Sequence, residues 1–152
     1  MADLTCYDRA VRLLAARPHF RAELEAKLAQ RGYFEEEIDG ALDRLAAQGY
    51  LDDARTARDF VAHRQEREAE GRLRLRAELA KRGAPEEAIE AALAELAPQD
   101  DLPAAREAAE RWAGRGRRPE DPAALARHLA RKGFSRRAIF AVLNESHDIE
   151  PE

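Results

Sequence analysis

Apolar residues recur along the chain at helical spacing, and the same arrangement occurs three times. Each copy reads Leu-Ala-x-[Arg/Lys]-Gly, followed by five variable residues, Ile, three further residues and Leu. The copies are LAQRGYFEEEIDGAL (28–42), LAKRGAPEEAIEAAL (79–93) and LARKGFSRRAIFAVL (129–143). Their glycines, at positions 32, 83 and 133, lie 51 and 50 residues apart. Such a constant period identifies a tandem repeat.

Each copy predicts two helices joined by a glycine turn. Two leucines, eight and four residues before the glycine, share one helix face, and the glycine can end that helix in a left-handed conformation. The Ile and the final Leu lie one turn apart and predict the second helix. The first-helix leucines are Leu24, Leu28, Leu75, Leu79, Leu125 and Leu129. The second-helix residues are Ile38, Leu42, Ile89, Leu93, Ile139 and Leu143.

A third apolar segment of helical character precedes each copy, so each repeat is expected to be a small three-helix unit. We therefore predict an all-α protein, a tandem array of three helix-turn-helix-like units that is elongated and able to curve. The expected boundaries are 1–48, 49–99 and 100–146, followed by a frayed tail at 147–152. The segment GYLDD (49–53) marks the first boundary, where either aspartate can cap the next helix.

Composition excludes several classes of protein. The chain has 152 residues, of which 37% are charged, and it contains no apolar run of membrane length and no signal-peptide pattern. A soluble cytoplasmic protein is expected. Its single cysteine, Cys6, excludes an intramolecular disulfide and a cysteine-based metal site. The four histidines are not paired at helical spacing, and no glycine-rich loop follows a strand. We expect no enzyme activity, no catalytic residue, no metal site and no cofactor.

Charge changes sign along the chain. Residues 1–70 contain 11 Lys/Arg and 15 Asp/Glu, whereas residues 111–137 contain nine Lys/Arg and two acidic residues. At equivalent turns FEEE becomes PEEA and then SRRA. The basic residues are candidates for contacts with a partner or with DNA. These candidates are Arg72, Arg74, Arg76, Arg117, Arg118, Arg131, Lys132, Arg136 and Arg137.

A DNA-reading helix-turn-helix is one alternative for the glycine turns. A recognition helix presents its N-terminal residues to bases and phosphates. In the first repeat these residues are Glu35, Glu36 and Glu37, which would repel phosphates and instead suit a helix N-terminus. Only the third repeat, with Arg136 and Arg137, has suitable charge. Its basic stretch is either a solvated face or a nucleic-acid contact, and the whole pattern favours a protein partner that is itself bound to nucleic acid.

The sequence resembles the RecX family, the bacterial regulators of the RecA recombinase, from about Ala10 to Leu143. The most specific stretch is GYLDDARTARDFVAHRQEREAEGRLRLRAELAKRG (49–83). The RKGF motif (131–134) adds to the resemblance in the third repeat. The residues that match family motifs are Gly49, Tyr50, Leu51, Asp52, Asp53, Phe60, Val61, Arg64, Gly71, Gly83 and Gly133.

The resemblance implies a non-catalytic protein that binds RecA and the RecA–DNA filament. It would inhibit filament growth, ATP hydrolysis, strand exchange and the SOS coprotease activity. We expect the acidic first half to face RecA, and the basic third repeat to lie nearer DNA or acidic RecA surface. A monomer without membrane contact is expected. Two other classes stay open: a helical protein that binds DNA directly and competes with RecA, and a helical scaffold for another partner.

Individual positions have expected roles. We predict that Tyr50 and Leu51 pack at a repeat junction and that Phe60, Val61 and Trp112 belong to the core.

Three further expectations concern caps and charges. Arg64 is either a structural ion-pair partner or a binding residue. The arginines at 72, 74 and 76 cannot all share one helix face, so at most two contact one partner surface. Phe20 stands where the family commonly has a helix-capping Ser or Thr, so that cap must come from elsewhere.

Overall fold

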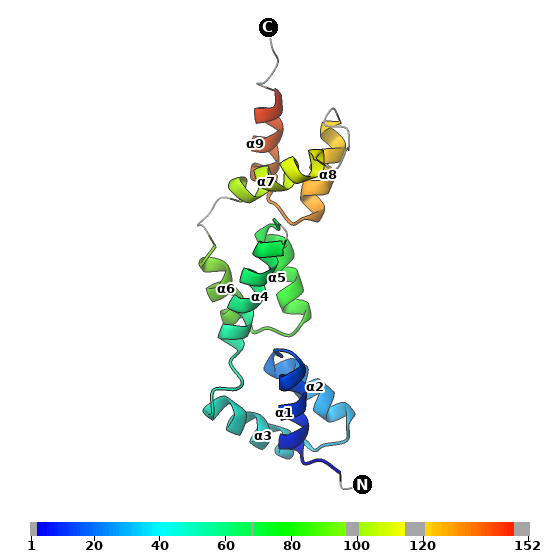
Figure 1. The fold of residues 1–152 in the computed structure, drawn as a ribbon, viewed down its shortest axis with the longest axis vertical. Helices are drawn as coiled ribbons and strands as arrows, with labels where there is room; N and C mark the ends of the chain where they lie inside the picture. The colour runs from blue at the N-terminus through cyan, green and yellow to red at the C-terminus, as the bar shows by residue number, and fades with distance from the viewer. Residues whose placement is uncertain (1–2, 68, 97–100, 115–120, 148–152) are drawn as a thin grey trace. The chain divides into compact units, whose positions relative to one another are not determined.

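The computed structural model describes residues 3–67, 69–96, 101–114 and 121–147, which contain nine α-helices and no strand (Figure 1). The predicted all-α class is confirmed. The helices are α1 (Cys6–Ala16), α2 (Arg21–Gln30), α3 (Glu35–Ala47), α4 (Asp53–Arg67), α5 (Arg72–Lys81), α6 (Glu86–Ala94), α7 (Leu102–Ala113), α8 (Pro122–Arg131) and α9 (Arg136–His147).

The chain folds into two compact units. The first contains the described residues of 1–59 and 79–92, and the second those of 60–78 and 93–152. The division into three repeats stays a prediction, and the tail expected to fray lies, beyond His147, outside the described residues.

The three repeated glycines end α2, α5 and α8 in the same way. Gly32, Gly83 and Gly133 have φ values of 90, 91 and 87°, the left-handed conformation that glycine adopts without a steric penalty. In each copy the residue after the glycine donates its N–H to the carbonyl of the leucine four residues before the glycine, at 3.3, 3.0 and 3.2 Å. This is the Schellman arrangement, and it confirms the predicted turns.

The core of the first unit lies between α1, α2 and α3 (Figure 1). Leucines and the isoleucine of the first sequence copy pack there against one face of α1. Its buried members are Cys6, Ala10, Leu24, Leu28, Ile38, Ala41, Leu42, Leu45 and Leu51.

The cap of α2 comes from a distant residue. The Oδ1 atom of Asp53 accepts from the N–H of Arg21 at 2.9 Å, and Glu23 Oε1 accepts from the N–H of Phe20 at 3.0 Å. Asp52 instead caps α4, accepting from the N–H of Arg55 at 3.1 Å. The two adjacent aspartates therefore stabilise two different helices. Partial burial raises the pKa of Asp53, although the hydrogen bond from Arg21 opposes that shift.

The first unit also contains a close contact at the second glycine turn. A Cβ atom placed on Gly83 would lie 2.9 Å from the Cβ of Ala22, so the turn sits directly against the first residues of α2. Arg82 strengthens this contact because its guanidinium lies 3.5 Å from Glu23 Oε1.

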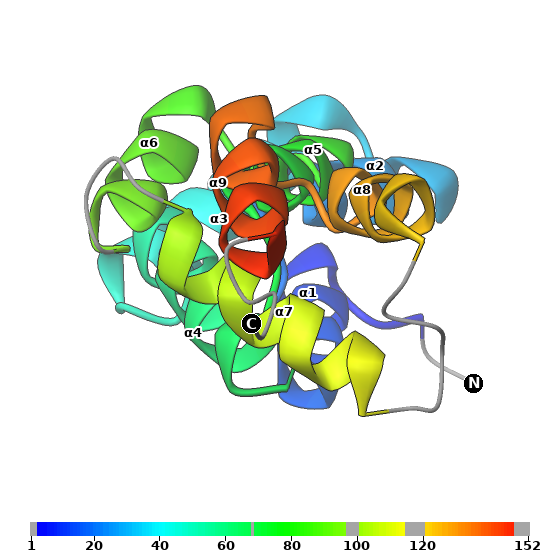
Figure 2. The same ribbon diagram turned by 90° about the horizontal axis from the view of Figure 1, so that it is seen from above.

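In the second unit α7 crosses α8 and α9, and the core fills the space between them (Figure 2). Trp112 stacks on His128 with ring centroids 5.8 Å apart. The buried residues are Ala69, Ala105, Ala108, Trp112, Leu125, Leu129, Phe134, Ala138, Ile139 and Val142.

Two of the five predicted packing residues differ from expectation. Leu51, Val61 and Trp112 are buried, as predicted. Tyr50 is 66% exposed, so its predicted packing role is wrong. Phe60 is only half-buried, and the guanidinium of Arg64 covers its ring at 5.2 Å. The helical stripe places Val61 inward, and Phe60, one residue earlier, lies at its margin.

Candidate functional site

The start of α5 lies directly against the turn between α8 and α9. The N–H of Gly71 donates to the carbonyl of Lys132 at 2.8 Å, and the N–H of Leu73 donates to the carbonyl of Gly133 at 3.3 Å. Carbonyls from the end of α8 thus satisfy N–H groups at the start of α5. The fold thus brings into contact two segments that are some sixty residues apart in the sequence.

Two glycines make this approach possible. A Cβ atom on Gly71 would lie 2.2 Å from the carbonyl oxygen of Gly133, and one on Gly133 would lie 2.4 Å from the backbone nitrogen of Arg74. Neither separation leaves room for a side chain. The sequence resemblance predicts that both glycines are family-motif positions, and the contact supplies a structural reason for glycine at each of them.

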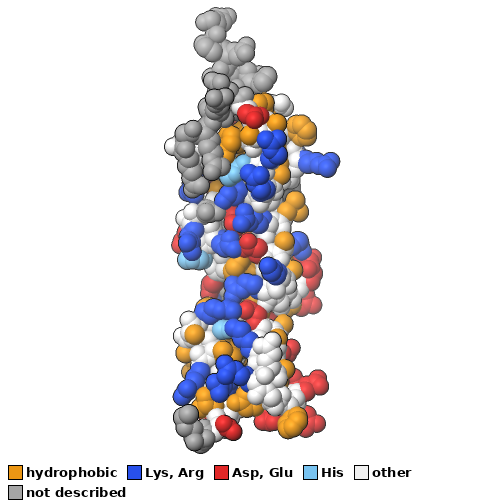
Figure 3. Space-filling view, turned by 90° about the vertical axis from the view of Figure 1, so that its right-hand side faces the viewer, with side chains coloured by type: hydrophobic (Ala, Val, Ile, Leu, Met, Phe, Trp, Pro, Cys, Tyr) orange, Lys and Arg blue, Asp and Glu red, His pale blue; other side chains and the backbone are white. Residues whose placement is uncertain are grey.

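The contact gathers basic residues that the sequence scatters. We call the resulting surface the basic junction. Lys and Arg side chains lie on the face of the second unit that Figure 3 shows. The basic junction combines residues from the start of α5, the end of α8 and the start of α9. Its members are Arg72, Arg74, Arg131, Lys132, Arg136 and Arg137.

Arg74 belongs to the interior of this surface. Its Nε lies 3.6 Å from Glu70 Oε1 and 3.5 Å from Glu78 Oε1, and its Nη1 donates to the carbonyl of Arg131 at 3.3 Å. These contacts join α5 to α8, so Arg74 is positioned to hold the junction together.

A buried carboxylate anchors the same network. The side chain of Glu70 is fully buried and accepts from Arg64 Nη1 at 3.0 Å. Arg64 Nη2 also donates to Glu78. Two guanidinium groups therefore neutralise two carboxylates, as a charge this deeply buried requires. Arg64 has the ion-pair role that its sequence position allows.

The other members face outward. The side chains of Arg72, Arg131, Arg136 and Arg137 form no ion pair with any other described residue, and all but the half-buried Arg72 are exposed. Arg136 begins α9, whose N-terminus carries the positive end of the helix dipole. Four cations at this site can bind phosphate or carboxylate oxygens through planar, two-pronged hydrogen bonds.

Three candidate residues are not members of the basic junction. Arg76 follows Arg74 on α5 and is half-buried, whereas Arg117 and Arg118 lie outside the described residues.

Within the described ranges no group of three or more His, Cys, Asp or Glu side chains could hold a metal ion. Cys6 is buried, and that burial, together with the charge of Glu37, raises the pKa of its thiol. Such a thiol stays protonated and unreactive at neutral pH. No described helix is long and apolar enough to cross a bilayer.

Ion pairs neutralise part of the acidic first unit. Glu23 accepts from Arg17 at 2.8 Å, and Asp43 accepts from Arg21 at 2.8 Å. Burial would raise the pKa of Glu23, but hydrogen bonds from Arg17 and the N–H of Phe20 outweigh it and lower the pKa. The charge available to a partner is therefore smaller than the sequence count indicates.

Comparisons with known proteins agree on one family. The model of the first three-helix domain of RecX matches residues 6–45, and that of the second three-helix domain matches residues 52–93. Regulatory protein RecX of Chromohalobacter salexigens is 40% identical over 132 residues, which cover 87% of this chain and 86% of that protein. Regulatory protein RecX of Thermus thermophilus is 44% identical over 125 residues, or 82% and 80% of the two chains.

A solved structure shares the fold. The crystal structure of RecX from Lactobacillus salivarius superimposes with a TM-score of 0.81 at 22% identity, covering 95% of this chain and 96% of that one.

Proposed function

Because this chain belongs to the RecX family of regulatory proteins, we propose that it binds RecA and the RecA–DNA filament. In this proposal it inhibits filament growth, and ATP hydrolysis, strand exchange and SOS coprotease activity fall as a result. It acts by occupying a binding surface and performs no chemistry of its own.

The basic junction is the observation that supports this proposal most directly. Backbone contacts join the start of α5 to the α8–α9 turn, and the segments that meet there carry four cations without ion-pair partners among the described residues. An anionic partner would satisfy them, and a nucleoprotein filament offers both DNA phosphates and acidic protein side chains.

Direct competition for DNA is a second candidate, and the same surface favours it. The two mechanisms differ in their dependence on salt. Each phosphate neutralised on single-stranded DNA steepens the slope of log affinity against log salt by about 0.7. Four arginines on phosphates would therefore give a slope of about −3 for naked DNA. Contacts made mainly with RecA would leave naked DNA weakly bound.

The test is DNA-dependent ATP hydrolysis by RecA from the same source, with this protein added below one copy per RecA. We expect inhibition at substoichiometric amounts and weak binding to naked DNA. Inhibition only when the protein saturates the DNA would favour direct competition, and no inhibition would refute both mechanisms.

A charge-reversal pair tests the surface itself. The double variant Arg136→Glu/Arg137→Glu should weaken inhibition and flatten its salt dependence. The matched control is Arg12→Glu/Arg31→Glu, which reverses two exposed charges of the first unit and gives the same net charge. Equal loss in both double variants would show that net charge, and not the basic junction, carries the effect.

A further inference from the structure

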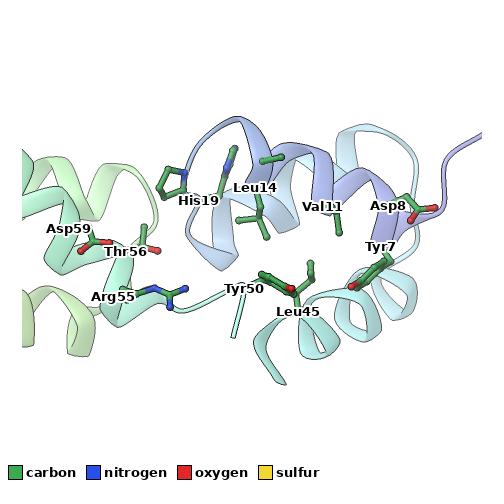
Figure 4. Close-up of a pocket in the computed structure, with 12 residues that line it drawn as sticks. Tyr7, Asp8, Val11, Leu14, His19, Leu45, Tyr50, Arg55, Thr56 and Asp59 are labelled. Atoms are coloured by element: carbon green, nitrogen blue, oxygen red, sulfur yellow. The ribbon is translucent and has the colours of Figure 1, made fainter. Parts of the chain in front are cut away.

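A groove of about 580 Å³ runs along α1 in the first unit (Figure 4). Helix α1, the end of α3, the α3–α4 connection and the first turns of α4 line it. Its middle is apolar and contains Val11, Leu14, Leu45 and Tyr50.

The apolar lining is exposed to water. Tyr50 is 66% exposed and Val11 is 40% exposed, although the opposite face of α1 already packs Cys6 and Ala10 into the core. A surface helix ordinarily has one apolar stripe and one polar face. In α1, Leu14 packs at the margin of the core, and Val11 extends the apolar stripe beyond it into solvent. With the exposed Tyr50 it forms an apolar surface of the kind that binds another protein.

Two carboxylates mark the ends of this groove. Figure 4 shows Asp8 at one end and Asp59 at the other, with the apolar side chains between them. Neither carboxylate forms an ion pair with a described residue. Asp8 lies in the first turn of α1, where the helix dipole stabilises a negative charge. Asp59 lies in the interior of α4, where the dipole gives its charge no such stabilisation.

The other polar lining residues are occupied. Arg55 Nη2 donates to the carbonyl of Gly49 at 2.8 Å. Burial, with the charges of Arg17 and Lys27, lowers the pKa of His19, so its ring is neutral at pH 7. The His19 ring bonds the Arg17 carbonyl through Nδ1 and Lys27 through Nε2. Arg55 keeps its positive charge, and the two aspartates are the carboxylates of the groove that have no ion-pair partner among the described residues.

We propose that this groove binds a protein segment in which an apolar side chain is flanked by Lys or Arg residues, supplied by RecA. The inference rests on the proposed function and adds a second contact to it. The apolar side chain fills the space over Val11 and Tyr50, and the flanking cations meet Asp8 and Asp59. Nucleic acid does not fit, because its phosphates would meet two carboxylates.

A second copy of the chain offers similar chemistry. Leu73 is 61% exposed between two arginines, but Arg74 is already paired with Glu70 and Glu78. Only Arg72 would be left to meet a carboxylate. Phe140 is 64% exposed one turn after Arg136 and Arg137, but no Lys or Arg follows it in α9, so its cations could reach only one end of the groove. RecA is therefore the better occupant.

The test uses two groove variants of the full chain with matched controls. Val11→Lys fills the groove with a cation, and its control Phe34→Lys changes a side chain that is 76% exposed outside the groove. Asp59→Lys reverses one end of the groove, and its control Glu90→Lys reverses an exposed charge on α6. Affinity for RecA assembled on single-stranded DNA is measured by co-sedimentation at fixed salt. Both groove variants should bind about tenfold more weakly than their controls.

Three outcomes would overturn the inference, and each has a distinct signature. If the wild type does not bind the filament, the proposed function is refuted, and the inference is refuted as well because it rests on that function. If the wild type binds and the groove variants match Phe34→Lys and Glu90→Lys, the inference alone fails. If sedimentation equilibrium of the wild type without RecA shows a dimer that Val11→Lys dissolves, the occupant is a second copy.

Discussion

Replacing Gly71 by alanine should separate the start of α5 from the α8–α9 turn. The new Cβ would lie 2.2 Å from the carbonyl oxygen of Gly133, so one of the two segments must move. Movement breaks or weakens the hydrogen bonds from the N–H groups of Gly71 and Leu73, which are 2.8 and 3.3 Å long. It also displaces Arg74, whose Nη1 reaches the carbonyl of Arg131.

The magnitude follows from these contacts. Two lost backbone hydrogen bonds cost about 1 kcal/mol each. Overpacking by one methyl group adds about 1–3 kcal/mol. Alanine also lowers the conformational entropy of the unfolded chain, which offsets the loss by about 0.5–1 kcal/mol. We therefore expect the free energy of unfolding of the second unit to fall by about 3 kcal/mol, which corresponds to a decrease in Tm of roughly 12–24 °C for a unit of this size.

Two other glycines provide controls because they isolate the separate effects. Gly32 has a φ of 90° but no atom within 4 Å of an added Cβ, so Gly32→Ala should cost only about 1–2 kcal/mol of backbone strain. Gly40 lies in the interior of α3 with open space around it, so Gly40→Ala should stabilise by about 0.5–1 kcal/mol.

Urea unfolding followed by tryptophan fluorescence is the appropriate assay. The single tryptophan, Trp112, lies in the core of the second unit and reports on it directly. Circular dichroism monitors helix loss in the whole chain. A Gly71→Ala midpoint by tryptophan fluorescence equal to that of the wild type would refute the close contact. Gly32→Ala and Gly40→Ala change the first unit, so their effects are measured by circular dichroism.

Two further predictions concern buried groups. Since burial lowers the pKa of His19 below its ordinary 6.5, its contribution to stability is complete above pH 6.5 and is lost as pH falls through the lower folded value. The urea midpoint of the first unit, followed by circular dichroism, should therefore decline below about pH 6.5, and His19→Gln should flatten that decline; an unchanged profile would contradict the assignment. Glu70→Gln removes the buried charge that Arg64 and Arg74 neutralise and should destabilise by about 3 kcal/mol in urea unfolding followed by tryptophan fluorescence. Glu66→Gln, an exposed control, should change stability by less than about 0.5 kcal/mol, and equal effects would show that the network contributes little.

The features that the sequence predicts depend on local spacing. The leucines at 24 and 28 share a helix face because they are one turn apart, and the glycine that follows can adopt a positive φ with no help from the rest of the fold. Helices and turns were therefore predictable. Asp53 illustrates the limit, since its sequence position indicates a cap for α4 whereas its carboxylate caps α2.

The candidate site depends on distant contacts that periodicity does not encode. Gly71 and Gly133 are 62 residues apart, and only the folded chain shows that each excludes a side chain at the other. The same holds for Arg74, which the charge pattern groups with Arg72 as a partner contact although it is paired with two glutamates. Gly71 immediately precedes α5, where a residue with a capping side chain is common. A glycine at that position was the one sequence feature that could have indicated a close backbone contact.

The contact between Gly83 and Ala22 has a counterpart at Gly133 and Arg74. In both, the glycine turn of one sequence copy rests on the first residues of the helix that precedes the glycine of the copy before it, α2 or α5. The first turn, at Gly32, has no such neighbour within 4 Å. A gene duplication of one 50-residue period would therefore carry its own docking geometry with it. Lineages could lengthen or shorten such a chain by whole repeats, provided that each new turn kept the glycine whose missing side chain permits the contact.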